Sequence, residues 1–345
     1  MRVLIVAEPI SPSMGSERVL GATVKWLRRF GVVVGVVDPR GEWPPWVMDG
    51  VDVVHFFNSG SSCKASLRFL EGVVGVPKVV TVTYWPPTVG EIRMAERVMK
   101  LNAEQAALIM QGRAAKDLTL FKICELADAL IFTSKREEEA FLLAADSFGF
   151  EFRGRRAIIE NAVDPDEIQG VKVEKEPGFC VTVGRVEVAK NQWQVIQVLR
   201  VIREEFPSVR YACVGMDSLG LKGKVRDSFV EFKGEVEPGE ALGILGRAEV
   251  HILASFRDTP GLASLEAGAL GCKLVVSDDP YGTARDYFPE DLVSFVDPLS
   301  EASIYRGVRE ALLRKADVRL RELILERYTY PVVVRKLVDL YNSVR

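Results

Sequence analysis

The chain has 345 residues, of which 48% are hydrophobic, and it carries a formal net charge of −3. This length suits two domains, each with a core of its own. The near-neutral charge does not suit a nucleic-acid-binding protein. No apolar run reaches the length of a membrane span, and the N-terminus lacks the apolar core and small-residue cleavage site of a signal peptide.

Five cysteines are scattered along the chain without a C-x-x-C pair. An odd number at irregular spacing is typical of reduced thiols in a cytoplasmic protein. With only two histidines, His55 and His251, and no clustered cysteines, we expect neither a zinc site nor a bound cofactor. The predicted location is the cytoplasm, with peripheral association at the inner membrane face left open.

The first half of the chain alternates short apolar runs with helical patterns. Strands are predicted at RVLIVAE, VVVGVVD, VDVVHFF, KVVTVTY, ALIFTS and RAIIEN. Helices are predicted at 16–31, at 66–75 and over 89–129, the last with a break near Gly112. Because nearly continuous Val/Ile runs are typical of strands buried on both faces, we predict a parallel sheet covered by helices.

A polar, charged stretch at 164–178 is predicted to be a linker, after which the alternation restarts. Strands are predicted at FCVTVGR, VRYACVG, VEFKGEV, VHILAS, KLVVSD and LVSFVD, and helices at 191–206, 241–247, 261–270, 302–315 and 318–344. The predicted fold class is α/β, with two Rossmann-like doubly wound domains, 1–163 and 179–325, facing each other across a cleft. Ligands of such domains bind at the carboxyl ends of the strands, so the cleft is the expected site.

Gly15 and Ser16 follow the first predicted strand and open a helix. Backbone N–H groups at such a turn suit a phosphate. The alternative is a plain strand-to-helix turn with Ser16 as the N-cap, which we favour when this signal stands alone. The spacing does not fit the G-x-G-x-x-G fingerprint of dinucleotide-binding proteins.

The segment VTVGRVEVAKNQ places Arg185 just after a buried strand and Lys190 just before a helix. A planar guanidinium and a mobile ammonium at the end of a strand suit a diphosphate. The alternative is a pair of surface cations on a loop.

The segment FRDTPGLASLEAGALGC also follows a strand and holds two carboxylates, Asp258 and Glu266. Gly261 permits a close approach of the backbone, and the helix that begins there favours anions. Glu266 lies among small packing residues, where a carboxylate is costly unless it accepts hydrogen bonds, as from ligand hydroxyls. The alternatives are an exposed helix residue for Glu266 and a turn-forming role for Asp258.

Two segments, EWPPWVMDG and TYWPPT, hold aromatic residues beside paired prolines. We expect Trp43 and Trp46 to pack in rigid loops, because tryptophan is mostly buried. Tyr84 and Trp85 either pack or form a lip for a lipid-linked acceptor or a sugar.

Basic and acidic residues alternate in the segment that follows the second of these motifs. This pattern indicates a solvated helix face, with attachment to a membrane surface left open. The residues are Glu91, Arg93, Glu96, Arg97 and Lys100.

Five segments resemble, in order, motifs of the retaining GT-B glycosyltransferases of group 1 (family four). The segments are IIENAVD, VGRVEVAKNQ, VEFKGEV, FRDTPGLASLEAGALGCKLVVS and ERYTYPVVVRKLVDLY. The resemblance covers nearly the whole chain and is strongest from Ile158 to Glu266. It implies that segment 326–345 is the family's closing helix, which packs back on the first domain.

The resemblance implies the metal-independent transfer of a sugar from a nucleotide-diphosphate sugar to the hydroxyl of a sugar, a lipid-linked sugar or a small molecule. Arg185 and Lys190 match the pair that binds the donor diphosphate and offsets charge on the leaving group. Asp258 matches an acid that contacts the transferred sugar, and Glu266 matches an acceptor of ribose hydroxyls. Further matches to donor-binding positions are Gly15, Ser16, Gly184, Lys233, Glu235, Gly261 and Leu262.

The chain departs from the family at several positions. Asp258 is shorter than the usual glutamate, Thr83 stands where many relatives carry a histidine, and DDPYGTARDYF lacks the G-G-x-x-E pattern. These changes indicate an unusual donor or altered chemistry. They leave two alternatives, a non-catalytic nucleotide-sugar-binding protein and a nucleotide-sugar epimerase, although the sequence shows no acid and base set beyond Asp258.

Overall fold

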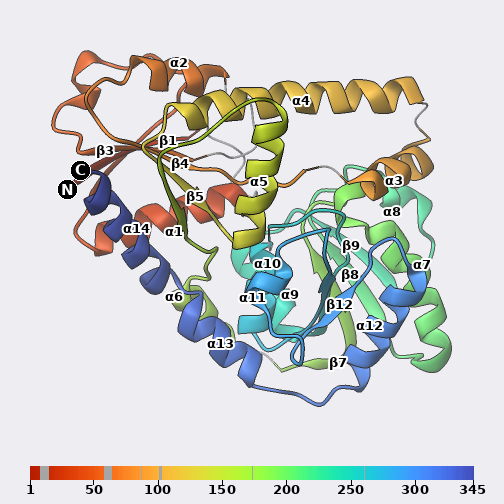
Figure 1. The fold of residues 1–345 in the computed structure, drawn as a ribbon. Helices are drawn as coiled ribbons and strands as arrows, with labels where there is room; N and C mark the ends of the chain where they lie inside the picture. Colours follow the sequence, from red (N-terminus) through yellow and green to blue (C-terminus); the bar gives the residue numbers. More distant parts are fainter. Residues whose placement is uncertain (8–14, 58–63, 87, 101–102, 173, 260) are drawn as a thin grey trace. The chain divides into compact units, whose positions relative to one another are not determined.

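The computed structural model describes residues 1–7, 15–57, 64–86, 88–100, 103–172, 174–259 and 261–345. The chain divides into two units. Unit 1 consists of Met1–Pro86, Ala107–Ala162 and Tyr330–Arg345, and unit 2 consists of Pro87–Ala106 and Val163–Thr329. Each unit is an α/β layer structure of its own (Figure 1).

Unit 1 is built on a six-stranded parallel sheet in the order β2-β1-β3-β4-β5-β6. Its strands are short and mostly buried, as their Val/Ile content predicts. They are β1 (Arg2–Val6), β2 (Val33–Val37), β3 (Val53–Phe57), β4 (Lys78–Thr81), β5 (Ala129–Phe132) and β6 (Arg155–Ile158).

Helices cover both faces of this sheet. One core cluster joins the sheet to α2, α4 and α5, and the other joins it to α1 and α14. The bounds are α1 (Gly15–Arg29), η1 (Pro45–Met48), α2 (Lys64–Gly72), α4 (Ala103–Glu125), α5 (Lys135–Ser147) and α14 (Tyr330–Val344).

Helix α5 is not among the predicted elements, although the sequence carries a signal for it. Ser134 is its N-cap and accepts a hydrogen bond from the Glu137 N–H at 3.1 Å. A serine followed three residues later by a glutamate is the pattern of a capping box.

Unit 2 is built on a second six-stranded parallel sheet, in the order β12-β11-β10-β7-β8-β9. Numbered from its own first strand, the order is 3-2-1-4-5-6 when read from β9, as in Rossmann folds. The strands are β7 (Glu176–Val183), β8 (Arg210–Val214), β9 (Val230–Gly234), β10 (Ala248–Leu253), β11 (Lys273–Ser277) and β12 (Ser294–Val296).

The helices of unit 2 also cover both faces, α9, α10 and α13 on one side and α7 and α12 on the other. Their bounds, with those of the shorter helices of the unit, are α3 (Val89–Met99), α6 (Pro165–Gln169), η2 (Val188–Lys190), α7 (Gln192–Glu205), α8 (Leu221–Lys224), α9 (Pro238–Arg247), α10 (Leu262–Ala269), α11 (Ala284–Tyr287), α12 (Glu301–Leu313) and α13 (Arg319–Arg327). The predicted fold class, with two Rossmann-like parallel α/β units, is confirmed.

Two segments differ from the predicted pattern. The predicted break near Gly112 is wrong, because α4 runs through that residue and the chain turns instead at Lys100, which has a left-handed φ of 54°. Residues 164–178, predicted as a linker, lie within unit 2 and contain α6, whose Ile168 is 3% exposed and part of the core.

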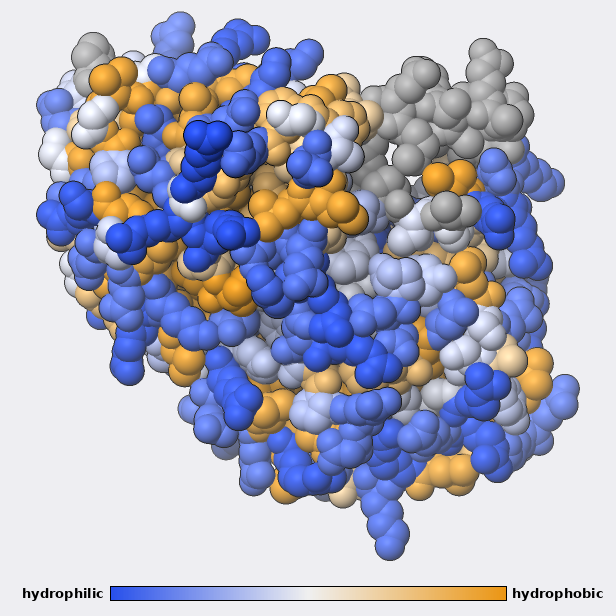
Figure 2. All heavy atoms as spheres, in the orientation of Figure 1, coloured by the Kyte–Doolittle hydropathy of each residue, from blue (hydrophilic) through white to orange (hydrophobic). Residues whose placement is uncertain are grey.

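Hydrophilic residues predominate on the visible face of the molecule, with hydrophobic ones interspersed (Figure 2). Among the described residues, no helix combines the length and the apolar character that crossing a membrane would require. Four of the five cysteines are buried free thiols, and Cys63 lies outside the described residues.

Candidate functional site

The strand order of unit 2 reverses between β7 and β10, which lie side by side. A reversal of this kind leaves a crevice beyond the carboxyl ends of the two strands, where ligands of open α/β sheets bind. The segments after β7 and β10 carry the predicted residues Arg185, Lys190 and Asp258. The fold therefore brings two distant sequence motifs to one edge of the sheet.

Glycines allow the chain to pass closely at the end of β7. Gly184 has a φ of 143° and donates its N–H to the Val214 carbonyl at 2.8 Å. Gly215 has a φ of 137°, and a Cβ there would lie 2.4 Å from the Gly184 carbonyl oxygen. A side chain at position 215 would clash with the backbone, and residues other than glycine rarely adopt this φ. The turn therefore depends on glycine.

Lys190 and Asp258 form an ion pair, with 2.8 Å between Nζ and Oδ2. Their side chains are 21% and 14% exposed. The two segments are also joined through the backbone, because the Phe256 N–H donates to the Ala189 carbonyl at 2.7 Å. The ammonium predicted to bind phosphate is thus held against the acid predicted to bind sugar.

The backbone of Asp258 is fixed by the segment after β11. Its N–H donates to the Tyr281 carbonyl, and its carbonyl accepts from the Thr283 N–H, each at 3.1 Å. A Cβ at Gly282 would lie 2.7 Å from the Asp258 carbonyl oxygen, so a glycine is needed for this approach. Gly282 was not among the predicted site residues, although it lies in the segment DDPYGTARDYF.

Arg185 is not brought into contact with this ion pair. Its side chain is 50% exposed and pairs with Glu187 at 3.3 Å. The Arg185 carbonyl accepts from the Gln192 amide at 2.9 Å, which ties the turn to the start of α7. Sequence reasoning missed Glu187 and Gln192, although their closeness to Arg185 in the sequence was a usable signal.

Helix α10 begins beside Asp258 and contains Glu266, which is 3% exposed. The interpretation of Glu266 as an exposed helix residue is therefore wrong. Gly261 is the N-cap of α10, without a side-chain cap, and a Cβ there would lie 3.2 Å from Asp258 Oδ2. With Leu262, it leaves N–H groups of the first turn available to an anion.

A buried histidine supports the same helix. His251 Nε2 lies 3.3 Å from the Ser264 hydroxyl of α10. Burial lowers the pKa of His251 to about 3, so the imidazole is neutral at neutral pH. It therefore stabilises α10 by packing and hydrogen bonding rather than by charge.

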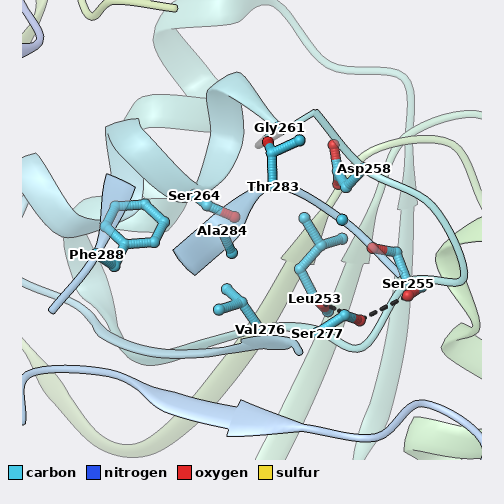
Figure 3. A pocket seen from close by; sticks show the side chains of 11 residues that line it. Leu253, Ser255, Asp258, Gly261, Ser264, Val276, Ser277, Thr283, Ala284 and Phe288 are labelled. Atoms are coloured by element: carbon cyan, nitrogen blue, oxygen red, sulfur yellow. Dashed lines mark hydrogen bonds between the residues drawn. The ribbon is translucent and has the colours of Figure 1, made fainter. Parts of the chain in front are cut away.

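A small pocket opens beside Asp258, between the ends of β10 and β11 and the starts of α10 and α11 (Figure 3). Ser255 and Thr283 line it, and neither side-chain oxygen has a hydrogen-bond partner among the described residues. The Ser277 hydroxyl donates to the Ser255 carbonyl at 2.6 Å. The pocket is thus polar on the side that faces Asp258.

The predicted donor-binding residues Lys233 and Glu235 lie at the end of β9, on the same edge of the sheet. Lys233 pairs with Glu231 at 2.6 Å, and Glu235 is exposed. Gly234 accepts a hydrogen bond from the Gly215 N–H at 2.8 Å. The carboxyl ends of β7, β8 and β9 are therefore linked through backbone groups.

The remaining predicted donor residues lie in unit 1. Gly15 and Ser16 are the first two residues of α1, so Ser16 lies inside the first turn instead of capping it. The side chain of Ser16 is outside the described part of the structure. Thr83 is exposed and has a φ of 47°, which is rare for a β-branched residue.

The aromatic residues of the two proline motifs divide differently from the prediction. Tyr84 is 6% exposed and packs edge-on against Phe141 at 5.6 Å, so the lip interpretation is wrong for it. Trp85 is half-buried. Trp43 packs as predicted, but Trp46 of the short helix η1 is 64% exposed, so the packing prediction is wrong for it.

No group of three or more His, Cys, Asp or Glu side chains among the described residues could hold a metal ion.

Helix α3, whose charges were predicted to face solvent, instead contacts this site. Glu91 pairs with Arg257, the neighbour of Asp258, at 2.9 Å. The solvated-face prediction is therefore wrong for Glu91.

Residues 164–322 match the model of a protein family described as "Glycosyl transferases group 1". None of the curated proteins compared with this sequence matches it.

Three solved structures resemble the whole chain. Sucrose-phosphate synthase from Thermosynechococcus elongatus is 16% identical with a TM-score of 0.72, over 99% of this chain and 98% of that one. An E. coli structure described as trehalose-6-phosphate bound with UDP-2-fluoro glucose is 13% identical with a TM-score of 0.67, over 100% of both chains. AviGT4, a glycosyltransferase involved in avilamycin A biosynthesis, is 15% identical with a TM-score of 0.62, over 100% of this chain and 98% of that one. At these identities the likeness establishes the fold, which is of the GT-B type.

Proposed function

Because residues 164–322 match the model of the group 1 glycosyl transferases, we propose that this protein is a retaining, metal-independent enzyme that moves a sugar from a nucleotide-diphosphate sugar to an acceptor hydroxyl. The observation that carries the proposal is the Lys190–Asp258 pair at the strand-order reversal of unit 2. At this edge the cation can bind the leaving phosphate of a donor, and the acid can contact the sugar of the same donor.

In the proposed donor complex, Lys190 exchanges part of its contact with Asp258 for the diphosphate. Arg185 turns from Glu187 toward the same phosphates, which its half-exposed side chain allows. The first-turn N–H groups at Gly261 and Leu262, which no side chain caps, add further donors. Fixed positive groups of this kind stabilise the charge that develops on a leaving diphosphate.

The carboxylates have separate roles in this proposal. The buried Glu266 accepts hydrogen bonds from the ribose hydroxyls. Asp258 contacts the transferred sugar. Because its carbonyl and N–H are fixed by Tyr281 and Thr283, its shorter side chain acts from a defined position.

The acceptor side is assigned to the segment that carries Thr83. A β-branched residue at positive φ is strained, and such strain is retained where the surroundings fix it, often at functional sites. The neighbouring Tyr84 N–H donates to the fully buried Glu137 carboxylate at 2.6 Å, which holds the segment in place. The group that this segment offers to an acceptor is the Thr83 hydroxyl, in place of an imidazole.

Calorimetric titration with UDP and other nucleoside diphosphates, followed by turnover assays with the matching nucleotide sugars, tests this function. Lys190→Ala should weaken binding of the preferred diphosphate by about 1.5–3 kcal/mol, the contribution of a charged hydrogen bond. The matched control is Lys222→Ala, which removes an exposed lysine of α8. Equal binding by wild type and Lys190→Ala would contradict the phosphate assignment. Binding without transfer or hydrolysis of any donor would instead indicate a non-catalytic binding protein.

A further inference from the structure

A second hollow of unit 2 is lined by Arg93, Met94 and Arg97 of α3, by Gln194 of α7, and by Leu299 and Glu301 at the start of α12. It has a volume of about 320 Å³, at the lower end of the range for small-molecule sites. None of these residues lines the pocket beside Asp258. We call this hollow the α3 groove.

Two arginines give the α3 groove its positive charge. Arg93 and Arg97 are one helical turn apart, so they project from the same face of α3. Both are exposed, and neither makes an ion pair with any residue that the structure describes. Like charges at this spacing repel each other and destabilise a helix slightly. An anion bound between the two arginines would turn this repulsion into a net attraction. Glu301 is the one carboxylate among the lining residues, so the arginines outnumber it.

A buried amide marks the floor of the groove. Gln194 is 3% exposed, and its Oε1 has no hydrogen-bond partner among the described residues. A buried acceptor left unpaired costs about 1–3 kcal/mol. A ligand hydroxyl that donates to this oxygen would remove the cost, so the groove offers an acceptor for a hydroxyl next to donors for an anion.

The wall formed by α3 is held in place before any ligand arrives. Glu91 of α3 pairs with Arg257 at 2.9 Å, and the Thr88 hydroxyl donates to the Phe256 carbonyl at 3.4 Å. Gly90 packs so tightly on Leu299 that a Cβ at Gly90 would lie 2.9 Å from the leucine side chain. A preformed wall lowers the ordering cost of binding.

Two helix ends add to the electrostatic preference of the groove. Gln194 lies in the first turn of α7, and Glu301 is the first residue of α12. The N-terminal ends of helices carry partial positive charge and favour anions. The two arginines and the two helix ends therefore all favour an anion in the groove. Glu301 is the one lining residue that disfavours an anion.

We propose that the α3 groove binds a small phosphomonoester that carries a free hydroxyl group. Arg93 and Arg97 hold the phosphate, as paired guanidinium groups do well, and Gln194 accepts the hydroxyl. This site is separate from the donor diphosphate assigned to Arg185 and Lys190, and it does not depend on that assignment.

Calorimetric titration of the full-length protein with glycerol 3-phosphate, inorganic phosphate and glycerol tests the proposal. We expect glycerol 3-phosphate to bind more tightly than inorganic phosphate, and glycerol alone not to bind. The double variant R93Q/R97Q should bind glycerol 3-phosphate at least tenfold more weakly. The double variant R226Q/R306Q, which removes two exposed arginines elsewhere in unit 2, should bind it as wild type does.

Three further variants separate this site from the donor site and from general charge effects. Lys190→Ala should retain glycerol 3-phosphate binding, whereas loss of binding would place the ligand at the donor site and overturn the proposal. Glu301→Gln should tighten binding, because it removes the opposing carboxylate. Gln194→Leu should equalise the affinities for glycerol 3-phosphate and inorganic phosphate. The proposal is also overturned if wild type and R93Q/R97Q bind glycerol 3-phosphate equally, or if wild type does not bind it at millimolar concentration.

Discussion

At the scale of single residues, the ion pair of Lys190 and Asp258 decides how the proposed donor site works. The Lys190 ammonium can pair either with Asp258, at 2.8 Å, or with the diphosphate of the proposed donor. In the proposed donor site, the aspartate therefore competes with a free nucleoside diphosphate for Lys190, and it contacts the sugar of an intact donor.

Removing the acid should separate these two effects. In Asp258→Ala, Lys190 is released, so a free nucleoside diphosphate should bind more tightly, by about 0.5–1 kcal/mol for a partly exposed pair. Transfer from the nucleotide sugar should fall at the same time, because the sugar loses its acid. Calorimetry and a product assay measure the two quantities. Weaker diphosphate binding in Asp258→Ala would show that the aspartate does not compete for Lys190.

At the scale of elements, α3 is the part whose role the sequence conceals most. Its charge alternation predicts a solvated helix, yet in unit 2 it packs on η2, which ends at Lys190, and pairs with the neighbour of Asp258. An amphipathic pattern shows which faces of a helix are polar. It does not show that one polar face will meet a cation of a segment some 160 residues away, as the Glu91–Arg257 pair does.

A double-mutant cycle on Glu91 and Arg257 tests whether α3 supports the site. The side chains of Arg257 and Glu91 are 32% and 16% exposed. We expect Glu91→Gln and Arg257→Gln to couple by about 0.5–1 kcal/mol in urea denaturation. Each single variant should also weaken nucleoside diphosphate binding, because the segment around Asp258 loses an anchor. Additive effects on stability would contradict the pairing, and Glu96→Gln on the exposed side of α3 is the control.

Much of the element pattern could be predicted because its cause is local. Short apolar runs predicted every strand of both sheets. The misplaced break near Gly112 has a physical reason: a lone glycine inside a helix costs only about 1 kcal/mol, which packing overrides. Helix α5 was missed although Ser134 and Glu137 carry its capping pattern.

The candidate site was only partly predictable from the sequence. Arg185, Lys190 and Asp258 follow from motifs, because each stands near a strand end or helix start that the sequence reveals. Glu266 follows from the same motif as Asp258, inside the helix that comes next. Gly282 and the pocket hydroxyl of Thr283 do not, because their importance comes from contacts with Asp258 across a separate loop. The burial of Tyr84 likewise depends on aromatic partners from α4 and α5.

At the scale of the whole molecule, two buried histidines link folding to pH. His55 lies between Tyr341 Oη at 2.6 Å and Thr81 Oγ1 at 2.8 Å, so it joins the closing helix α14 to the sheet of unit 1. Burial lowers the pKa of His55 to about 3, as it does for His251 in unit 2. The folded state keeps both imidazoles neutral, whereas the unfolded chain binds protons below its pKa near 6.5.

The chain should therefore lose stability as the pH falls from about 6.5 toward 3. In that window the unfolded state binds more protons, so each histidine lowers the free energy of unfolding by up to about 1.4 kcal/mol per pH unit. Glu137 opposes this trend, because burial raises its pKa and acid removes the cost of its charge. Urea denaturation at pH 7.5 and 5.5 measures the difference.

The histidine substitutions provide the control for this pH dependence. His55→Gln and His251→Gln together remove every histidine of the chain, so the loss of stability between pH 7.5 and 5.5 should largely disappear. Since both side chains are buried, the variants should be less stable at pH 7.5, but with a smaller dependence on pH. An unchanged difference between the two pH values would assign the effect to carboxylates instead.

The sequence by itself determined the α/β class, the two parallel sheets and the positions of the charged residues that follow their strands. These features follow from local patterns of burial and turn formation. Only the tertiary structure decided which charges meet: that Lys190 pairs with Asp258, that Arg185 stays with Glu187, and that two arginines of α3 line a groove with a buried amide. The reason is physical. Strand order and helix packing set the distances between residues remote in sequence, and electrostatic interactions depend on those distances.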